Sequence, residues 1–219
     1  VDKGVTSSFN MDMDANNGWY MAVVDYGTYP GWSELSYWMY GMADQAGNYQ
    51  RWLALSISAK DPNPTGGPVL IITPDTRFPQ GATVEAQQAA DGTYIRTPSN
   101  ISGVWARPDR GTWRWSYYHL NRYSEYYQWN DFTYSEININ EMNLLKAEAL
   151  YRKDDKAGAA AIINATRTAA GLNATDAAGT NTSCVPKLPN GQCGDLLEML
   201  KWEKRMEVAM QGLYGAPWF

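Results

Sequence analysis

The sequence has few of the residues on which most metal, catalytic and nucleic-acid sites depend. Its 219 residues include one His and two Cys, and 18 Lys and Arg stand against 23 Asp and Glu. The net charge of −5 argues against a nucleic-acid-binding protein, because phosphate contacts require a face rich in Lys and Arg. No zinc-binding pattern of Cys and His occurs. We therefore expect no metal site of this kind and no nucleic-acid partner.

Long apolar runs and an export signal are also missing. No run of about 18 apolar residues occurs, so no segment predicts a transmembrane helix. The sequence starts at Val1 without a signal peptide and stops in the apolar stretch 213–219. We expect it to be a window of a longer polypeptide, with any export signal or lipidated Cys outside it.

No set of catalytic residues emerges. The single histidine, His119, lies in an aromatic run, and no G-x-S-x-G or comparable nucleophile signature is present. Glu203 and Glu207 share one helix face while Arg205 points away from them. We interpret these three residues as structural contacts to neighbouring helices or loops. The sequence therefore predicts a protein that is not an enzyme and needs no cofactor.

One stretch near the start has the oxygen spacing of a calcium loop. Asp12, Asp14 and Asn16 stand at the first, third and fifth positions of such a loop. Gly18 comes one residue late, and Val23 stands where a bidentate Glu should be. We interpret the stretch as an Asx-rich turn without a metal, and calcium near Asp12 and Asp14 stays an open alternative.

The C-terminal third carries the clearest helical signals. Asn140 is a suitable N-cap for a helix over 140–153, and a second helix is predicted over 156–170, with Gly171 as its left-handed terminator. Small and bulky residues are spaced on this pair as in one tetratricopeptide unit. We predict antiparallel packing with three of its side chains buried: Leu145, Ala149 and Ile163. Asp195, with Glu198 three residues on, predicts a third capped helix over 195–212.

The rest of the chain predicts shorter elements. Gly41 and Gly47 limit any helix between 32 and 57. Val69–Thr73 is typical of a short buried strand, and 83–90 of a short helix. The predicted fold class is mainly α: a tetratricopeptide-like helical hairpin plus further helices, with an irregular aromatic-rich region and a few short strands.

Two phrases in the C-terminal helices carry a family resemblance. The stretch 140–151 contains an "AEA" helix, and 160–172 ends in the pattern N-x-x-R-x-x-A-G-L. Residues 202–207, Trp-Glu-Lys-Arg-Met-Glu, followed by Gly212, fit a later W-x-E-R-R-x-E helix. Together they resemble the SusD/RagB family. Asp154 replaces the usual Gly of the turn, and Gln211 replaces a Glu, without breaking the helical pattern. The pattern residues matched in order are Asn164, Arg167, Ala170, Gly171 and Leu172.

Upstream, the segments 40–50, 72–81 and 111–115 are similar to a divergent subgroup of that family. The resemblance implies a lipid-anchored protein on the outer surface of the outer membrane of a Gram-negative cell. It would lie as a lid over a TonB-dependent, SusC-like transporter and bind glycans or oligopeptides. Residues 1–139 would form the irregular aromatic-rich ligand-binding part and 140–219 the helical tetratricopeptide-like part of one domain. The alternative is a structural or self-assembling surface protein on the same scaffold.

Two further expectations concern cysteines and aromatic rings. In an exported protein, Cys184 and Cys193 predict a disulfide, because the Asn190-Gly191 turn between them brings the ends together; two free cytosolic thiols are the alternative.

The chain holds 10 Trp and 15 Tyr, and eleven aromatic residues lie between 105 and 134. Sugars stack on such rings, whereas a core use is the alternative for each ring. The predicted stacking platform is Trp105, Trp113, Trp115 and Tyr118.

Overall fold

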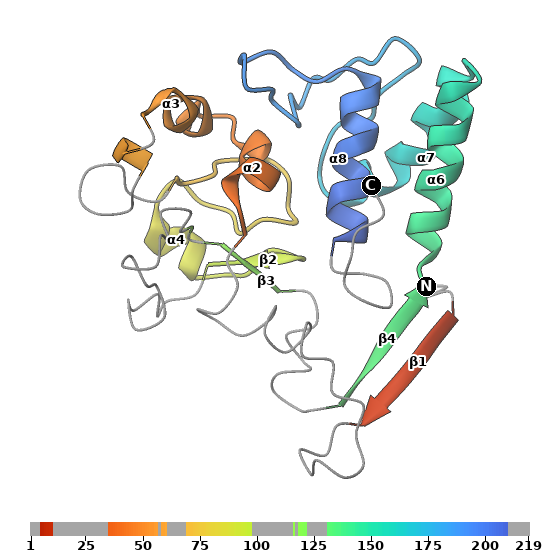
Figure 1. Cartoon of the computed structure of the whole chain (residues 1–219), viewed down its shortest axis with the longest axis horizontal. Coiled ribbons are helices and arrows are strands. Elements are labelled where there is room, and N and C mark those ends of the chain that lie inside the picture. Colours follow the sequence, from red (N-terminus) through yellow and green to blue (C-terminus); the bar gives the residue numbers. More distant parts are fainter. Residues whose placement is uncertain are drawn as a thin grey trace. The chain divides into compact units, whose positions relative to one another are not determined.

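The computed structural model describes residues 5–10, 35–56, 58–60, 69–97, 116, 118–121 and 131–209. These residues fall into two units, which are coloured by sequence in Figure 1. Unit 1 comprises Val1–Tyr29, Tyr123–Thr182 and Asp195–Phe219, and unit 2 comprises Pro30–Arg122 and Ser183–Gly194. In the part described, helices outweigh strands, which confirms the predicted mainly α fold class. The division at residue 139 into a ligand-binding and a helical part concerns function and stays a prediction.

Three helices form the core of unit 1: α6 (Ile139–Arg152), α7 (Lys156–Ala169) and α8 (Leu196–Val208). Each of them packs against the other two, and Figure 1 draws them in green (α6), cyan (α7) and blue (α8). No strand interrupts the three predicted spans within 140–209, so the helical hairpin with its third helix is confirmed. The side chains at their centre are Leu144, Ala147, Ala160, Ile163, Leu196, Met199 and Leu200.

Two details of α6 differ from the sequence prediction. The N-cap is Asn138, whose side chain accepts from the Asn140 N–H at 2.7 Å, so the helix begins one residue before Asn140. The predicted burial of Leu145 and Ala149 is wrong, because both are exposed, whereas Ile163 on α7 is fully buried as predicted. The helices α7 and α8 pack on the face of α6 that carries Leu144 and Ala147. Leu145 lies about 100° from Leu144 around the axis of α6 and is therefore outside this face.

The helix α7 ends as its sequence predicted. Gly171 adopts the left-handed conformation with φ of 74°. Its N–H donates to the Thr168 carbonyl at 3.1 Å, and the Leu172 N–H donates to the Arg167 carbonyl at 2.9 Å. These are the two hydrogen bonds of a Schellman motif, and Leu172 is buried beneath the turn.

The helix α6 ends in the same motif with a different residue. Asp154 takes the left-handed position with φ of 65°, and its N–H donates to the Tyr151 carbonyl at 3.0 Å. The next N–H, of Asp155, donates to the Leu150 carbonyl at 2.9 Å. The resemblance places a Gly at this turn, and the φ value explains that preference, since only Gly adopts it without strain.

Unit 2 is built from short helices around aromatic rings. The elements are α2 (Tyr37–Tyr40), η1 (Gly41–Ala43), α3 (Asn48–Ala54), η2 (Ser58–Lys60), α4 (Val84–Gln88), β2 (Ile95–Arg96) and β3 (His119–Leu120). Tyr37 meets Trp52 edge to face at 5.4 Å, and Phe78 meets Tyr40 at 6.3 Å. A Cβ on Gly41 would lie 2.1 Å from the Tyr49 ring, so glycine is required where α2 ends. The predicted helix over 83–90 is confirmed as α4.

The segment 69–73 is buried as predicted but is not a strand. Most of its hydrogen-bonded backbone groups bind side chains, and the Ile72 carbonyl accepts from the Gln45 N–H at 2.7 Å. The Ile72 N–H donates to Asp44 Oδ1 at 3.0 Å, and the Ile71 N–H donates to the Tyr118 hydroxyl at 2.7 Å. Partners that lie far away in sequence therefore satisfy the segment, which apolar alternation alone cannot reveal.

The remaining strands belong to two separate pairs. In unit 1, β1 (Val5–Asn10) pairs antiparallel with β4 (Asp131–Ile137). In unit 2, β2 pairs antiparallel with β3, so that Arg96 lies opposite His119. The sequence predicted a few short strands without their partners. Among the described residues, no helix is long and apolar enough to cross a bilayer.

Candidate functional site

Three of the four predicted platform residues, Trp105, Trp113 and Trp115, lie outside the described residues. The fourth, Tyr118, lies in the core of unit 2 with 1% of its surface exposed. Its ring packs edge to face on Phe78 at 6.1 Å. A ring covered in this way has no open face for a sugar, and for Tyr118 the structure gives the core position that was the alternative.

The Tyr118 hydroxyl closes a small buried hydrogen-bond network. It donates to Gln87 Oε1 at 2.7 Å and accepts from the Ile71 N–H at 2.7 Å. Gln87 Nε2 in turn donates to the Ile71 carbonyl at 2.8 Å. These three bonds join the side chains of Tyr118 and Gln87 to the backbone of Ile71, so the network fixes Tyr118, within the aromatic run, against α4 and the segment 69–73. His119, the next residue, is buried in β3, in agreement with its structural interpretation.

A buried carboxylate organises the first part of unit 2. Asp44 is fully buried, and its Oδ2 accepts from the Tyr49 N–H at 3.1 Å at the start of α3. Its Oδ1 accepts from the N–H groups of Ala46 and Ile72 at 3.2 and 3.0 Å. This residue belongs to the segment 40–50 noted in the sequence, and its role here is to join α3 to the segment 69–73.

A second buried charge lies in the segment 72–81. Arg77 donates from Nε and Nη2 to the two oxygens of Asp75, at 2.9 and 2.8 Å. Both side chains are at most 3% exposed. Such a two-bond pair is strong only as a pair, because either charge alone would be desolvated without compensation.

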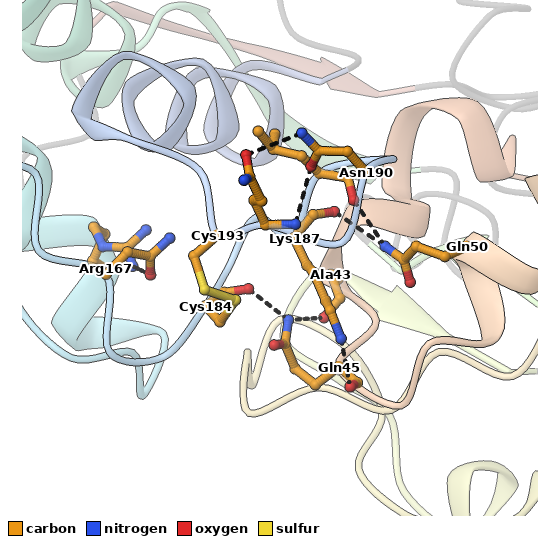
Figure 2. Close-up of a disulfide and its surroundings, with 11 residues drawn as sticks. Ala43, Gln45, Gln50, Arg167, Cys184, Lys187, Asn190 and Cys193 are labelled. Atoms are coloured by element: carbon orange, nitrogen blue, oxygen red, sulfur yellow. Dashed lines mark hydrogen bonds between the residues drawn. A yellow bond between two sulfur atoms is a disulfide. The ribbon is translucent and has the colours of Figure 1, made fainter.

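The predicted disulfide is present between Cys184 and Cys193, whose Cα atoms lie 4.7 Å apart (Figure 2). The Gly191 N–H donates to the Leu188 carbonyl at 2.8 Å, and Gly191 adopts φ of 84°. The Leu188 N–H donates to the Gln192 carbonyl at 2.8 Å. This is a tight hairpin with glycine in the left-handed position, as the Asn190-Gly191 pair predicted.

The disulfide hairpin is held within unit 2 by the side chains of Gln45, just before α3, and Gln50, within α3 (Figure 2). Gln45 Nε2 donates to the Cys184 carbonyl at 2.7 Å. Lys187 Nζ donates back to the Gln45 carbonyl at 3.1 Å. Gln50 Nε2 donates to the Leu188 carbonyl at 3.1 Å. The hairpin is therefore a docked part of the unit rather than an isolated loop.

The N-x-x-R-x-x-A-G-L phrase has a structural role at each described position. Asn164 binds the backbone of Thr175 twice: Nδ2 donates to its carbonyl at 2.9 Å and Oδ1 accepts from its N–H at 2.8 Å. Arg167 is fully buried, and its guanidinium lies 3.5 Å from Glu203 Oε1 and 3.3 Å from Asn181 Oδ1. The phrase joins α7 to α8 and to the loop after α7.

The acidic residues of α8 are structural, as predicted. Glu203 faces Arg167 in the core, and Glu207 Oε2 accepts from Asn140 Nδ2 at 2.9 Å. Arg205 turns away from both and lies over the Trp202 ring at 5.9 Å. With these partners, the two carboxylates act as contacts between helices. Over the described ranges, no three His, Cys, Asp or Glu residues form a cluster suited to a metal, and Asp12 and Asp14 lie outside these ranges.

The comparison with protein families agrees with these phrases. The model of the SusD family matches residues 69–214, about two thirds of the chain. The match includes the segments 72–81 and 111–115 and starts after 40–50. We found no significant match among curated proteins or solved structures. SusD family proteins are non-catalytic binding proteins, typically lipoproteins at the outer-membrane surface, and pair with a SusC-like transporter. With most of its length matched, the chain belongs to the SusD family.

Proposed function

We propose that this protein captures glycans at the outer surface of the outer membrane and delivers them to a SusC-like, TonB-dependent transporter. Family membership supports nutrient binding at the surface with a SusC partner. The observation that carries the choice of ligand is the aromatic run between 105 and 134, which lies inside the matched residues 69–214. An oligopeptide is the other ligand class that the family suggests.

The proposed stacking platform consists of Trp105, Trp113 and Trp115. In an extended backbone, alternate residues face the same side, so Trp113 and Trp115 would present their rings together. Tyr118 has a supporting role in this proposal, because its buried hydroxyl network holds the chain three residues after Trp115. An anchor so close to the rings reduces the entropy that ligand binding must overcome.

Neutral sugars are the proposed ligands. The chain carries a net charge of −5, which disfavours uronic or sulfated polysaccharides through long-range repulsion. Flat, rigid rings bind the apolar faces of sugars with little loss of side-chain freedom. The polar residues within the run that would bind the hydroxyl groups are Asn121, Arg122, Asn130 and Asp131. In functional terms, residues 1–139 would carry the ligand site and 140–219 the helical scaffold.

A glycan array followed by calorimetry tests the proposal. Trp113→Ala and Trp115→Ala should each weaken the binding of a neutral glycan hit by about 1–3 kcal/mol without lowering the melting temperature. Trp38→Ala is the matched control, because Trp38 is exposed in α2 and lies outside the aromatic run. Unchanged affinity of both variants would refute the platform. Oligomers that form without ligand, together with an array without hits, would favour the self-assembling surface protein instead.

A further inference from the structure

A groove of about 370 Å³ lies between α6 and α8 in unit 1. Its lining side chains are Glu148, Arg152, Leu197, Leu200, Lys201, Lys204 and Arg205. Four of them are cationic and one is anionic, and two leucines supply the apolar part. Such a concentration of cations contrasts with the net charge of −5 of the whole chain.

Two carboxylates bind cations of the groove. Glu148 uses both oxygens: Oε1 accepts from Arg152 Nη2 at 2.5 Å and Oε2 from Lys204 Nζ at 2.7 Å. Hydrogen bonds from Lys204 and Arg152 lower the pKa of Glu148, so this carboxylate is ionised at neutral pH. Lys201 is paired with Glu198 at 2.6 Å. The side chains of Arg152 and Lys201 are nevertheless 75% and 54% exposed, so each cation can bind a further carboxylate from outside.

An apolar ridge continues this groove along α6. Met142, Leu145 and Ala149 are exposed and stand at i, i+3 and i+7, so they lie on one helix face. The face leads directly to the groove, because Arg152 follows Leu145 by two turns. Met142 and Leu145 are 54% and 40% exposed, although the amphipathic pattern of the sequence predicted burial for Leu145 and Ala149. This face of α6 is apolar like a protein core, and no described residue covers it. Such an exposed apolar face is suited to a protein partner.

The groove is not suited to a sugar. Its lining residues include no aromatic ring, and Trp202, which follows Lys201 on α8, is buried with the Arg205 guanidinium over it. Aliphatic side chains at helical spacing beside flexible cations instead match an amphipathic helix whose apolar residues alternate with Asp or Glu. Complementary charge would orient such a segment, and the ridge would bury its apolar side chains.

We propose that the ridge and the groove bind an acidic amphipathic segment of a partner protein. Its apolar side chains would pack on Met142, Leu145 and Ala149, and its carboxylates would bind Arg152 and Lys201 in place of water. The proposal rests on α6 and α8 alone and does not depend on the glycan platform. The two can therefore fail separately.

The probe is a fluorescein-labelled synthetic peptide of about four helical turns, with Leu on one face and Glu on the other. Fluorescence anisotropy with the intact chain should show saturable binding that weakens as salt rises from about 0.05 to 0.5 M. A peptide with Gln for every Glu, and one with Ser for every Leu, should each bind at least about tenfold more weakly.

Two variants of the protein locate the site. Lys201→Glu should weaken binding of the acidic peptide about tenfold, and Leu145→Ser about fivefold. The matched controls, Lys156→Glu on α7 and Leu55→Ser in unit 2, make the same chemical changes at exposed positions elsewhere and should bind as the natural chain does. Circular dichroism melting checks that all four fold.

The outcomes separate the alternatives. Equal losses in the site variants and their controls would overturn the proposal, as would no binding of the acidic peptide at low salt. Binding of a sulfated oligosaccharide, abolished by Lys201→Glu, without peptide binding would assign the groove to an anionic glycan instead. The Lys201→Glu variant should keep its affinity for any neutral glycan hit, so this proposal can fail while the glycan proposal stands.

Discussion

The two units maintain their structure by different means. Unit 1 buries mainly aliphatic side chains from three helices whose backbone hydrogen bonds are local, with the Arg167–Glu203 pair as a buried polar contact between two of them. Unit 2 buries aromatic rings together with polar side chains that bind backbone groups far away in sequence, such as Asp44 with Ile72 and Tyr118 with Ile71. Apolar packing tolerates small changes, whereas a buried polar group that loses its partner retains its full desolvation penalty. A substitution that removes one partner of a buried polar contact should therefore lower stability more than a small apolar change in the helical core of unit 1.

The largest expected effect compares the buried ion pair of Arg77 in unit 2 with an exposed ion pair in unit 1. Arg77→Met leaves the buried Asp75 carboxylate without its cation, so the free energy of unfolding should fall by about 3–5 kcal/mol. Urea denaturation followed by tryptophan fluorescence measures it. The control is Arg152→Met in unit 1, which removes an exposed ion pair with Glu148 and should cost less than about 1 kcal/mol. Similar losses in both variants would contradict the comparison.

The disulfide is the next feature of unit 2 to test. Replacing both Cys184 and Cys193 by Ala should lower the free energy of unfolding by about 2.5–3 kcal/mol, because the bridge restricts a short loop in the unfolded chain. Reducing agent added to the natural chain should produce the same loss and have no effect on the variant. Thiols that titrate in the native oxidised protein would exclude the bridge.

In unit 1, overpacking should have a moderate effect. Ala159 on α7 is buried one turn before Ile163 of the core, and Ala159→Leu should cost about 1–3 kcal/mol. The exposed neighbour on the same helix gives the control, since Ala161→Leu should change the free energy of unfolding by less than about 0.5 kcal/mol. A thermal melt compares the two. If Ala159→Leu were neutral, the close packing of the helical pair would be in doubt.

The turn after α6 offers a smaller, stabilising change. Asp154 holds φ of 65°, which costs an L-residue energy, so Asp154→Gly should raise the free energy of unfolding by about 0.5–1 kcal/mol. The adjacent Asp155 accepts from the Gly158 N–H and caps α7, so Asp155→Ala should instead cost about 1 kcal/mol. The two substitutions should therefore change the free energy of unfolding in opposite directions. Changes in the same direction would contradict the left-handed conformation of Asp154 or the capping role of Asp155.

The smallest effect concerns pH and the contact between α6 and α8. Hydrogen bonds from Lys204 and Arg152 lower the pKa of Glu148 from its ordinary value of 4.5. A lowered pKa in the folded state stabilises the protein above the unfolded value, and this contribution disappears as pH falls through the folded value. Glu148→Gln should therefore flatten the loss of stability below about pH 4.5, measured by urea denaturation at a series of pH values. The natural chain and the variant should converge in acid, and a constant difference across the series would contradict this.

Local signals predicted the helices well because their causes lie within a few residues. Asp195 caps α8 by accepting from the Glu198 N–H at 3.0 Å, three residues away. The same holds for Gly171 after α7 and for the hairpin between Cys184 and Cys193. In each case the sequence contains both partners of the contact. The predicted strand over 69–73 was wrong, because the hydrogen-bond partners of this segment, Asp44 and Tyr118 among them, belong to other parts of the chain.

The functional features show the same contrast between linear patterns and contacts between distant segments. The family phrases at 160–172 and 202–207 identified the kind of protein, and the structure then explained them through Asn164, Arg167 and Glu203. The groove was missed, although Lys201, Lys204 and Arg205 stand at helical spacing, because its apolar wall and Arg152 come from two different helices.

Residue order alone was enough to locate the helices of the C-terminal third, to pair the cysteines and to indicate the family. Those properties depend on residues that are neighbours along the chain or on a linear pattern. The packing of the folded chain was needed to show that Leu144 rather than Leu145 faces the core, and that Tyr118 is buried with its hydroxyl bound. Both depend on which distant segment lies opposite, and an amphipathic helix with two adjacent apolar stripes leaves that choice to its packing partners.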